Sequence, residues 1–128
     1  MYQQAALENY RRLQLETATP HELVERLYVA AIRSCRAAAK ALEEDNKDQA
    51  HEAIHRAQDI LTELMAALDF NAGGEVASHL HQLYRYMYGR LVTAQVGSDP
   101  AAAKEVADLL SPIAEAWAEI RPGNKPVG

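Results

Sequence analysis

Hydrophobic residues recur at three- and four-residue intervals along most of this chain, in four segments that short polar, glycine- or proline-containing stretches separate. This spacing is typical of amphipathic helices, and no strand-like alternation interrupts it. Short connections favour antiparallel neighbours. The sequence predicts an all-α fold, an antiparallel up-down-up-down four-helix bundle with a short N-terminal arm or helix. The helices are expected over residues 20–44, 48–70, 75–96 and 100–120.

The signal for the start of the first helix is the strongest in the chain. Thr19 is a candidate N-cap, Pro20 suits the first helical position, and Glu22 completes a capping box. Because the chain breaks just before this signal, residues 1–18 read as a separate arm. The bundle is expected over 19–121 and a flexible tail over 122–128. Pro112 lies inside the last helix and is expected to kink or break it.

Two of the four helices have broader apolar surfaces than a single core stripe needs. On 20–44, Tyr28, Ile32 and Val29 continue the core line round one flank, and on 75–96 Tyr88 and Val92 do the same. If these additional apolar residues are exposed, they mark a surface that binds a partner. If they are buried where neighbouring helices meet, they belong to the core of the bundle. Both readings stay open. The core line itself is expected at Val24, Leu27, Ala31, Cys35, Ala38 and Leu42 on the first helix, and at Val76, Leu80, Leu83, Tyr84, Met87, Leu91 and Ala94 on the third.

Composition narrows the classes of function. The chain has 128 residues, 48% of them hydrophobic, which suits one domain with one core. A net charge of −5, with Arg11 and Arg12 as the local basic pair, argues against a nucleic-acid or anionic-membrane surface. A lone cysteine, Cys35, fits a reducing compartment. With no signal-peptide core and no run long enough to span a membrane, we expect a soluble cytoplasmic protein without membrane insertion.

One segment matches a catalytic motif. His51, Glu52 and His55 have the spacing of the H-E-x-x-H zinc site of metalloproteases. The core line of this helix, however, puts Glu52 nearly opposite the core and His55 toward solvent. The extension of the motif is also missing, because Gln58 and Leu61 stand where further zinc-site residues would. The sequence favours solvated surface residues here, and it predicts no catalytic residue, no metal and no cofactor. We also expect His21, in the first turn, to be exposed.

Several short motifs follow one another in a specific order. They are Tyr10, Thr17-Ala18-Thr19-Pro20, Glu22-Leu23, Leu27-Tyr28, Ala31-Ile32, Ala57-Gln58-Asp59-Ile60, Gly73-Gly74-Glu75-Val76-Ala77, Leu83-Tyr84-Arg85-Tyr86-Met87 and Arg90-Leu91. In this order and spacing the chain resembles the FliS family of flagellin-specific export chaperones over nearly its whole length. It departs from that pattern at Val29-Ala30, where an acidic or amide residue is usual, and at Gly89-Arg90, where two arginines are.

The resemblance implies a function. A cytosolic bundle would bind the C-terminal segment of flagellin, prevent its premature polymerisation, and aid its delivery to the flagellar type III export apparatus. The export gate and a co-chaperone are further implied partners. The arm would cover part of the binding groove until cargo arrives. The residues expected to contact partners are Leu7, Tyr10, Leu23, Leu27, Tyr28, Ile32, Tyr84, Met87, Tyr88, Leu91 and Val92.

Two alternatives remain at this stage. The first is a regulatory adaptor whose main partner is another flagellar protein, such as an anti-sigma factor or a co-chaperone. The second, less favoured, is a zinc metalloenzyme that uses His51 and His55. A flagellin peptide that binds the purified chain would argue against the first, and metal analysis tests the second.

Overall fold

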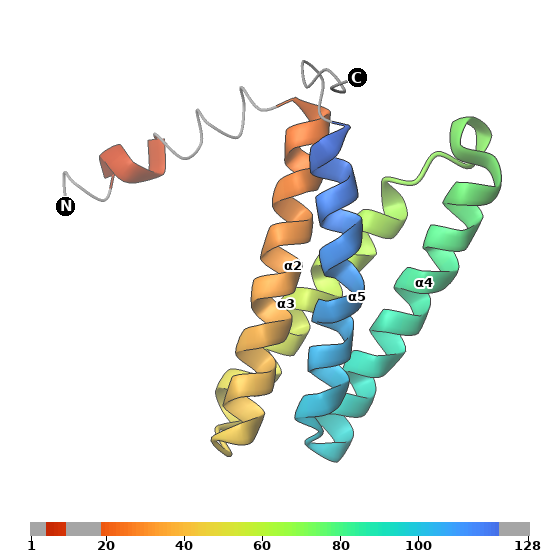
Figure 1. Cartoon of the computed structure of the whole chain (residues 1–128). Coiled ribbons are helices and arrows are strands. Elements are labelled where there is room, and N and C mark those ends of the chain that lie inside the picture. The colour runs from red at the N-terminus through yellow and green to blue at the C-terminus, as the bar shows by residue number, and fades with distance from the viewer. Residues whose placement is uncertain (1–4, 10–18, 121–128) are drawn as a thin grey trace.

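The computed structural model describes residues 5–9 and 19–120. Four long helices run in alternating directions and form one bundle (Figure 1). They are α2 (Pro20–Glu43), α3 (Lys47–Ala66), α4 (Phe70–Gly97) and α5 (Pro100–Glu119). A short helix over 5–9 precedes them, and no strand occurs in the described part of the chain. The prediction of an all-α helical bundle is confirmed.

The four helices do not pack equally closely. α2 packs extensively against α3 on one side and α5 on the other, while α4 completes the ring with smaller contacts to the same two helices. In Figure 1 the beginning of α4 diverges from α5, whereas α2 and α5 lie side by side along their length. The core between the helices is built from small and branched residues, with Ile54, Leu61, Met87, Leu91 and Leu110 among its largest fully buried side chains.

A polar side chain caps the beginning of each long helix. Thr19 Oγ1 accepts a hydrogen bond from the Glu22 backbone N–H at 3.1 Å, which confirms the predicted N-cap. Asn46 Oδ1 accepts from Gln49 N at 3.3 Å, and Asp99 Oδ1 from Ala101 N at 3.1 Å. These caps satisfy backbone donors that the first turn leaves without an intrahelical partner.

The boundary between the second and third predicted helices is wrong by several residues. α3 ends at Ala66, and Asp69 caps α4 by accepting hydrogen bonds from Asn71 N and Ala72 N. The residues from Phe70 onward therefore belong to α4, and the expected break survives only as non-helical angles at Gly74 (φ 52°, ψ −126°). Glycine accepts this positive φ because it has no Cβ.

Two smaller expectations about the helices also need correction. Val76, expected in the core, is 66% exposed, because the beginning of α4 diverges from its neighbours and Ala77 is the first residue of α4 to be buried. Pro112 was expected to kink or break the last helix; α5 continues through it to Glu119, so the break does not occur.

Candidate partner-binding site

The structure buries several residues that the sequence assigned to a partner surface. Tyr28 and Ile32 on α2 do not extend an exposed flank, so of the two readings left open for them the structure supports packing within the bundle. Because α2 packs against α3 and α5 at once, it needs a wide apolar face, and both side chains are taken up in that face. The predicted contact residues that prove to be buried are Tyr28, Ile32, Tyr84, Met87 and Leu91.

Tyr28 and Tyr84 meet in the interior of the bundle. Their hydroxyl groups form a hydrogen bond between α2 and α4, which do not neighbour each other in the ring. Burial raises the pKa of both phenols, and for Tyr84 the hydrogen bond to Tyr28 raises it further. Since each hydroxyl satisfies the other, the pair holds α4 across the core without leaving a buried polar atom unpaired.

A ring-stacking contact joins the beginning of α2 to the end of α5. The rings of His21 and Trp117 stack with centroids 4.6 Å apart and planes 11° from parallel. Trp117 Nε1 donates to the His21 carbonyl at 3.1 Å, while His21 Nε2 lies 2.8 Å from the Trp117 carbonyl and 3.0 Å from Glu25 Oε1. His21 is therefore partly buried, and the expectation that it is exposed is wrong.

Beside this contact, the same end of the bundle contains a small apolar hollow. Its volume is about 80 Å³, and all four helices contribute to its wall. The lining residues are Val24, Tyr28, Leu64, Ala67, Leu68, Leu80, Tyr84 and Trp117. The hollow is large enough for a small apolar side chain of a partner, but not for a helix.

A larger groove runs between α3 and α4. Its volume is about 560 Å³, and Thr62, Met65, His81, Arg85, Tyr88 and Gly89 line it. The flexible thioether of Met65, the aromatic ring of Tyr88 and the guanidinium of Arg85 are groups that adapt well to another protein surface. Gly89 leaves the groove open, because a Cβ placed there would meet no other atom within 4 Å. Tyr88 is the predicted contact residue that lines this groove.

The other predicted contact residues are more accessible. Tyr88 and Val92 on α4 are 38% and 42% exposed, Leu23 on α2 is also exposed, and Leu27 is partly buried against the core. Leu7 lies on the short helix over 5–9 and is 55% exposed, so it does not cover a groove in this structure. Tyr10 lies outside the described residues.

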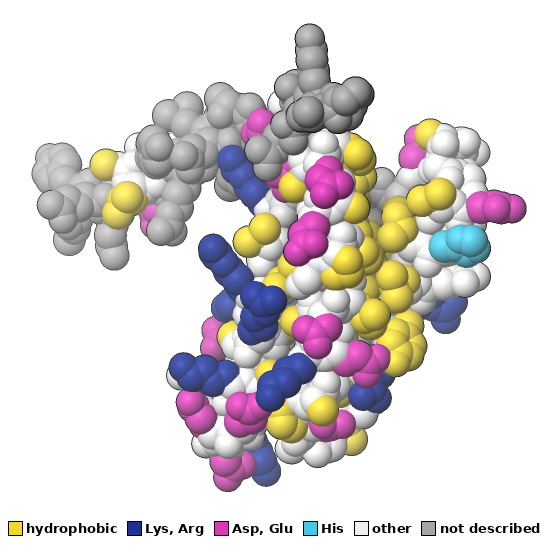
Figure 2. Space-filling view, viewed as in Figure 1, with side chains coloured by type: hydrophobic (Ala, Val, Ile, Leu, Met, Phe, Trp, Pro, Cys, Tyr) yellow, Lys and Arg dark blue, Asp and Glu magenta, His cyan; other side chains and the backbone are white. Residues whose placement is uncertain are grey.

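Apolar surface is concentrated on and beside α4. Its exposed large hydrophobic residues are Phe70, Val76, Tyr86, Tyr88, Val92 and Val96. Figure 2 shows further hydrophobic side chains along the line where α5 faces α4. Partly buried residues on these two helices include Leu80, Leu83, Leu109 and Ile113. The loosely packed helix is thus also the one that leaves most apolar surface uncovered.

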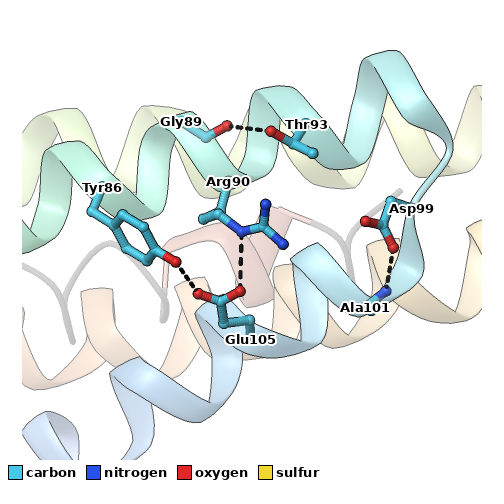
Figure 3. Close-up of polar contacts among 7 residues, drawn as sticks. All are labelled: Tyr86, Gly89, Arg90, Thr93, Asp99, Ala101 and Glu105. Atoms are coloured by element: carbon cyan, nitrogen blue, oxygen red, sulfur yellow. Dashed lines mark hydrogen bonds and ion pairs between the residues drawn. The ribbon is translucent and has the colours of Figure 1, made fainter.

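A polar contact ties α4 to α5 farther along the bundle. Glu105 on α5 accepts a hydrogen bond from the Tyr86 hydroxyl, and its other oxygen lies 3.0 Å from Arg90 Nε (Figure 3). The bond to Glu105 raises the pKa of Tyr86. This contact could not be predicted from the sequence, because Glu105 lies on a different helix and no spacing rule links it to Arg90.

The histidine motif lies on the outer side of α3. His51 is partly buried, while Glu52 and His55 are exposed, and Glu52 is 3.9 Å from Arg56. Within residues 5–9 and 19–120, no three His, Cys, Asp or Glu side chains are grouped so as to hold a metal ion. In the same described ranges, none of the helices has the length and apolarity that crossing a membrane requires.

The fold and this surface define a class: an all-α bundle that presents apolar surface and a groove on one loosely packed helix. Residues 2–124 match the family model of the flagellar protein FliS. The chain is 38% identical to the flagellar secretion chaperone FliS of Salmonella typhimurium, covering 95% of this chain and 94% of that one. It is 34% identical to FliS of Bacillus subtilis (84% and 80% covered) and 32% identical to FliSB of Pseudomonas aeruginosa (91% and 96%).

The chain belongs to the FliS family. Its function is therefore that of a flagellar secretion chaperone, and the resemblance noted in the sequence is confirmed. The relatives are named as chaperones and not as enzymes.

Proposed function

We propose that this chain is a cytosolic chaperone that binds the C-terminal segment of flagellin, keeps it from polymerising too early, and aids its delivery to the type III export apparatus. The observation that carries the proposal is the apolar surface of α4, with the groove of about 560 Å³ beside it. A groove between two helices accepts the apolar face of an amphipathic helix, which is the binding mode expected for such a cargo.

The proposed contact residues follow from exposure. Tyr88 and Val92 on α4 contact the cargo directly, and Met65 and Arg85 complete the groove. Leu23, exposed in the first turn of α2, is a further apolar contact residue. Tyr84, Met87 and Leu91 lie beneath this surface and hold α4 in position. No nucleotide, metal or covalent step takes part, because masking an apolar segment needs only complementary surface.

The cargo segment is expected to fold as it binds. Ordering a flexible chain costs free energy, which burial of apolar surface on the order of 1,000–3,000 Å² offsets. Binding should therefore show a negative heat-capacity change and a gain of helical signal. Calorimetric titration of the full chain with a flagellin C-terminal peptide at several temperatures tests this. Absence of binding, while the protein remains helical by circular dichroism, would refute flagellin as the cargo.

A further inference from the structure

The outer side of α2 carries a line of basic residues that the net charge of the chain conceals. Arg26, Arg33, Arg36 and Lys40 follow one another at intervals of seven, three and four residues along the helix, and all four are exposed. We refer to these four residues as the basic stripe. They span 15 residues, or about 21 Å of helix. Figure 2 shows the dark blue side chains gathered over α2, beside α5.

Within the described part of the chain, no side chain of the basic stripe forms an ion pair. The ion pairs of the described residues are His21–Glu25, Arg56–Glu52, Arg90–Glu105 and Lys104–Glu43, and none includes a residue of the stripe. Four uncompensated cations in one row repel one another. A row of acidic side chains brought beside them would remove this repulsion and add attraction.

Apolar surface lies next to the stripe. Two shallow hollows, of about 270 and 250 Å³, share Val29 and Arg33. Ala30 belongs to the first hollow, while Ile32 and Ala114 belong to the second, which lies between α2 and α5. Val29 is 46% exposed. An apolar strip flanked by charge along two antiparallel helices is the surface that a third helix packs on in a bundle.

We propose that the basic stripe and these two hollows form a second docking surface, for a partner protein that presents an amphipathic helix with a row of acidic side chains. The apolar face of that helix would lie over Val29 and Ala114, and its acidic flank would lie along α2. In the ring of helices, the α2–α5 side is opposite the α3–α4 groove. A partner bound here leaves that groove open, so the chaperone can hold its cargo and this partner together.

The charges around the stripe favour a helix over a flat anionic surface. Glu25 lines one hollow and Glu115 the other, and a membrane or a nucleic acid would bring its negative charge against both. The net charge of −5 adds to that repulsion at longer range. A single helix can align its acidic row with α2 alone. The chain's own arm is a poor occupant, because residues 1–18 contain two glutamates and two arginines and have no net acidic row.

The test uses two synthetic amphipathic peptides with the same leucine face. One has glutamate along its flank and the other has lysine at the same positions. Fluorescence anisotropy with the full chain should show binding of the glutamate peptide, weakening as salt is raised, and no comparable binding of the lysine peptide. The double variant Arg33→Glu with Arg36→Glu should bind the glutamate peptide about tenfold more weakly, because two exposed charge pairs become repulsive. Arg33→Gln with Arg36→Gln should give a smaller loss.

The control variant, Lys47→Glu with Arg56→Glu, makes the same change in net charge on α3 and should alter the affinity less than about twofold. If both double variants lost the same affinity for the glutamate peptide, the peptide would be attracted by the overall charge of the protein, and the proposal would be overturned. An unchanged affinity in the Arg33 and Arg36 variants, or failure of the glutamate peptide to bind, would also overturn it. Tighter binding to phosphatidylserine vesicles than to the peptide would assign the stripe to a membrane, and competition by the flagellin peptide would make it part of the cargo site. Either result contradicts a separate acidic-helix surface.

Discussion

Cys35 on α2 is completely buried, and desolvation raises the pKa of its thiol from 9.0 to about 12. A buried thiol of this kind is a small apolar group and a poor nucleophile at neutral pH. Because the folded-state pKa is raised above the unfolded value, the folded protein keeps the proton that the unfolded chain loses. The resulting stability is complete below pH 9 and is lost as the pH rises toward 12.

The Cys35→Ala variant tests this linkage. Between pH 9 and 10 the free energy of unfolding of the native sequence should fall faster than that of the variant, by up to about 1.4 kcal/mol per pH unit. Urea unfolding under reducing conditions at pH 7, 9 and 10 measures the difference. Parallel curves would show that the thiol titrates in the folded protein as it does in the unfolded chain.

Gly89 lies exposed in the interior of α4, where a Cβ would meet no other atom within 4 Å. Gly89→Ala should therefore raise the free energy of unfolding by about 0.5–1 kcal/mol, because alanine loses less backbone entropy in a helix. Gly74→Ala is the matched control. With φ at 52°, it should destabilise the protein although no atom lies near its Cβ either. Destabilisation by Gly89→Ala would mean that the open backbone at this position is itself required.

At the scale of whole helices, α4 differs from the other three. Its contacts to α3 and α5 are smaller than those that α2 makes with them, and the residues from Phe70 to Val76 are all exposed. The Tyr28–Tyr84 hydrogen bond and the contacts of Glu105 with Tyr86 and Arg90 hold it farther along. A helix with little burial at one end opens locally at low free-energy cost.

Hydrogen exchange should reveal this difference between helices. Amides of residues 70–82 on α4 should exchange faster than those of α2 and α3, and cargo bound at the groove should slow exchange on α4 more than on α2. Mass spectrometry of peptic fragments, with and without a flagellin C-terminal peptide, measures both effects. Uniform exchange across the four helices would contradict the loose packing of α4. If the cargo peptide protected only amides of α2, the binding site would lie on α2 and not on α4.

The sequence predicts the helices well because their signals are local. Thr19 and Pro20 fix the start of α2 through hydrogen bonds and dihedral angles within one turn, and the periodic apolar stripe fixes each core face. The sequence misplaces the start of α4, because Asn71 and Gly73 resemble a loop, whereas the Asp69 cap allows a helical turn there.

The candidate site was harder to predict for a physical reason. Whether the side chain of Tyr28 or Tyr88 is buried depends on how many other helices pack against that side of its helix. The spacing of residues along one helix does not reveal how many neighbours it has. Tyr28 is buried in the core, whereas Tyr88 lines a groove and stays exposed. Contacts between helices, such as Arg90 with Glu105, are inaccessible to the same reasoning.

For the molecule as a whole, the N-terminal arm remains a proposed element of regulation. Leu7 is exposed, so a capping state would be a different arrangement from the one described. Deleting residues 2–15 should leave the bundle folded and the affinity for a flagellin peptide equal or higher, because removing a competitor increases the fraction of open sites. Calorimetry on the truncated and full chains compares the two, with circular dichroism as the test of folding. Loss of binding on deletion would make the arm part of the cargo site.

The central claim is that cargo binds the apolar surface of α4. Val92 on α4 and Val29 on α2 offer a matched pair, since they are the same residue type with similar exposure, 42% and 46%. Val92→Asp should lower the affinity for a flagellin C-terminal peptide at least about tenfold, because the carboxylate would be buried without a partner. Val29→Asp should change the affinity for the same peptide by less than about twofold. Both variants should unfold at the same urea concentration as the native sequence to within experimental error. Titration calorimetry of the three proteins against one peptide makes the comparison. An unchanged affinity in Val92→Asp, or a loss in Val29→Asp of equal size, would contradict the assignment of cargo to α4.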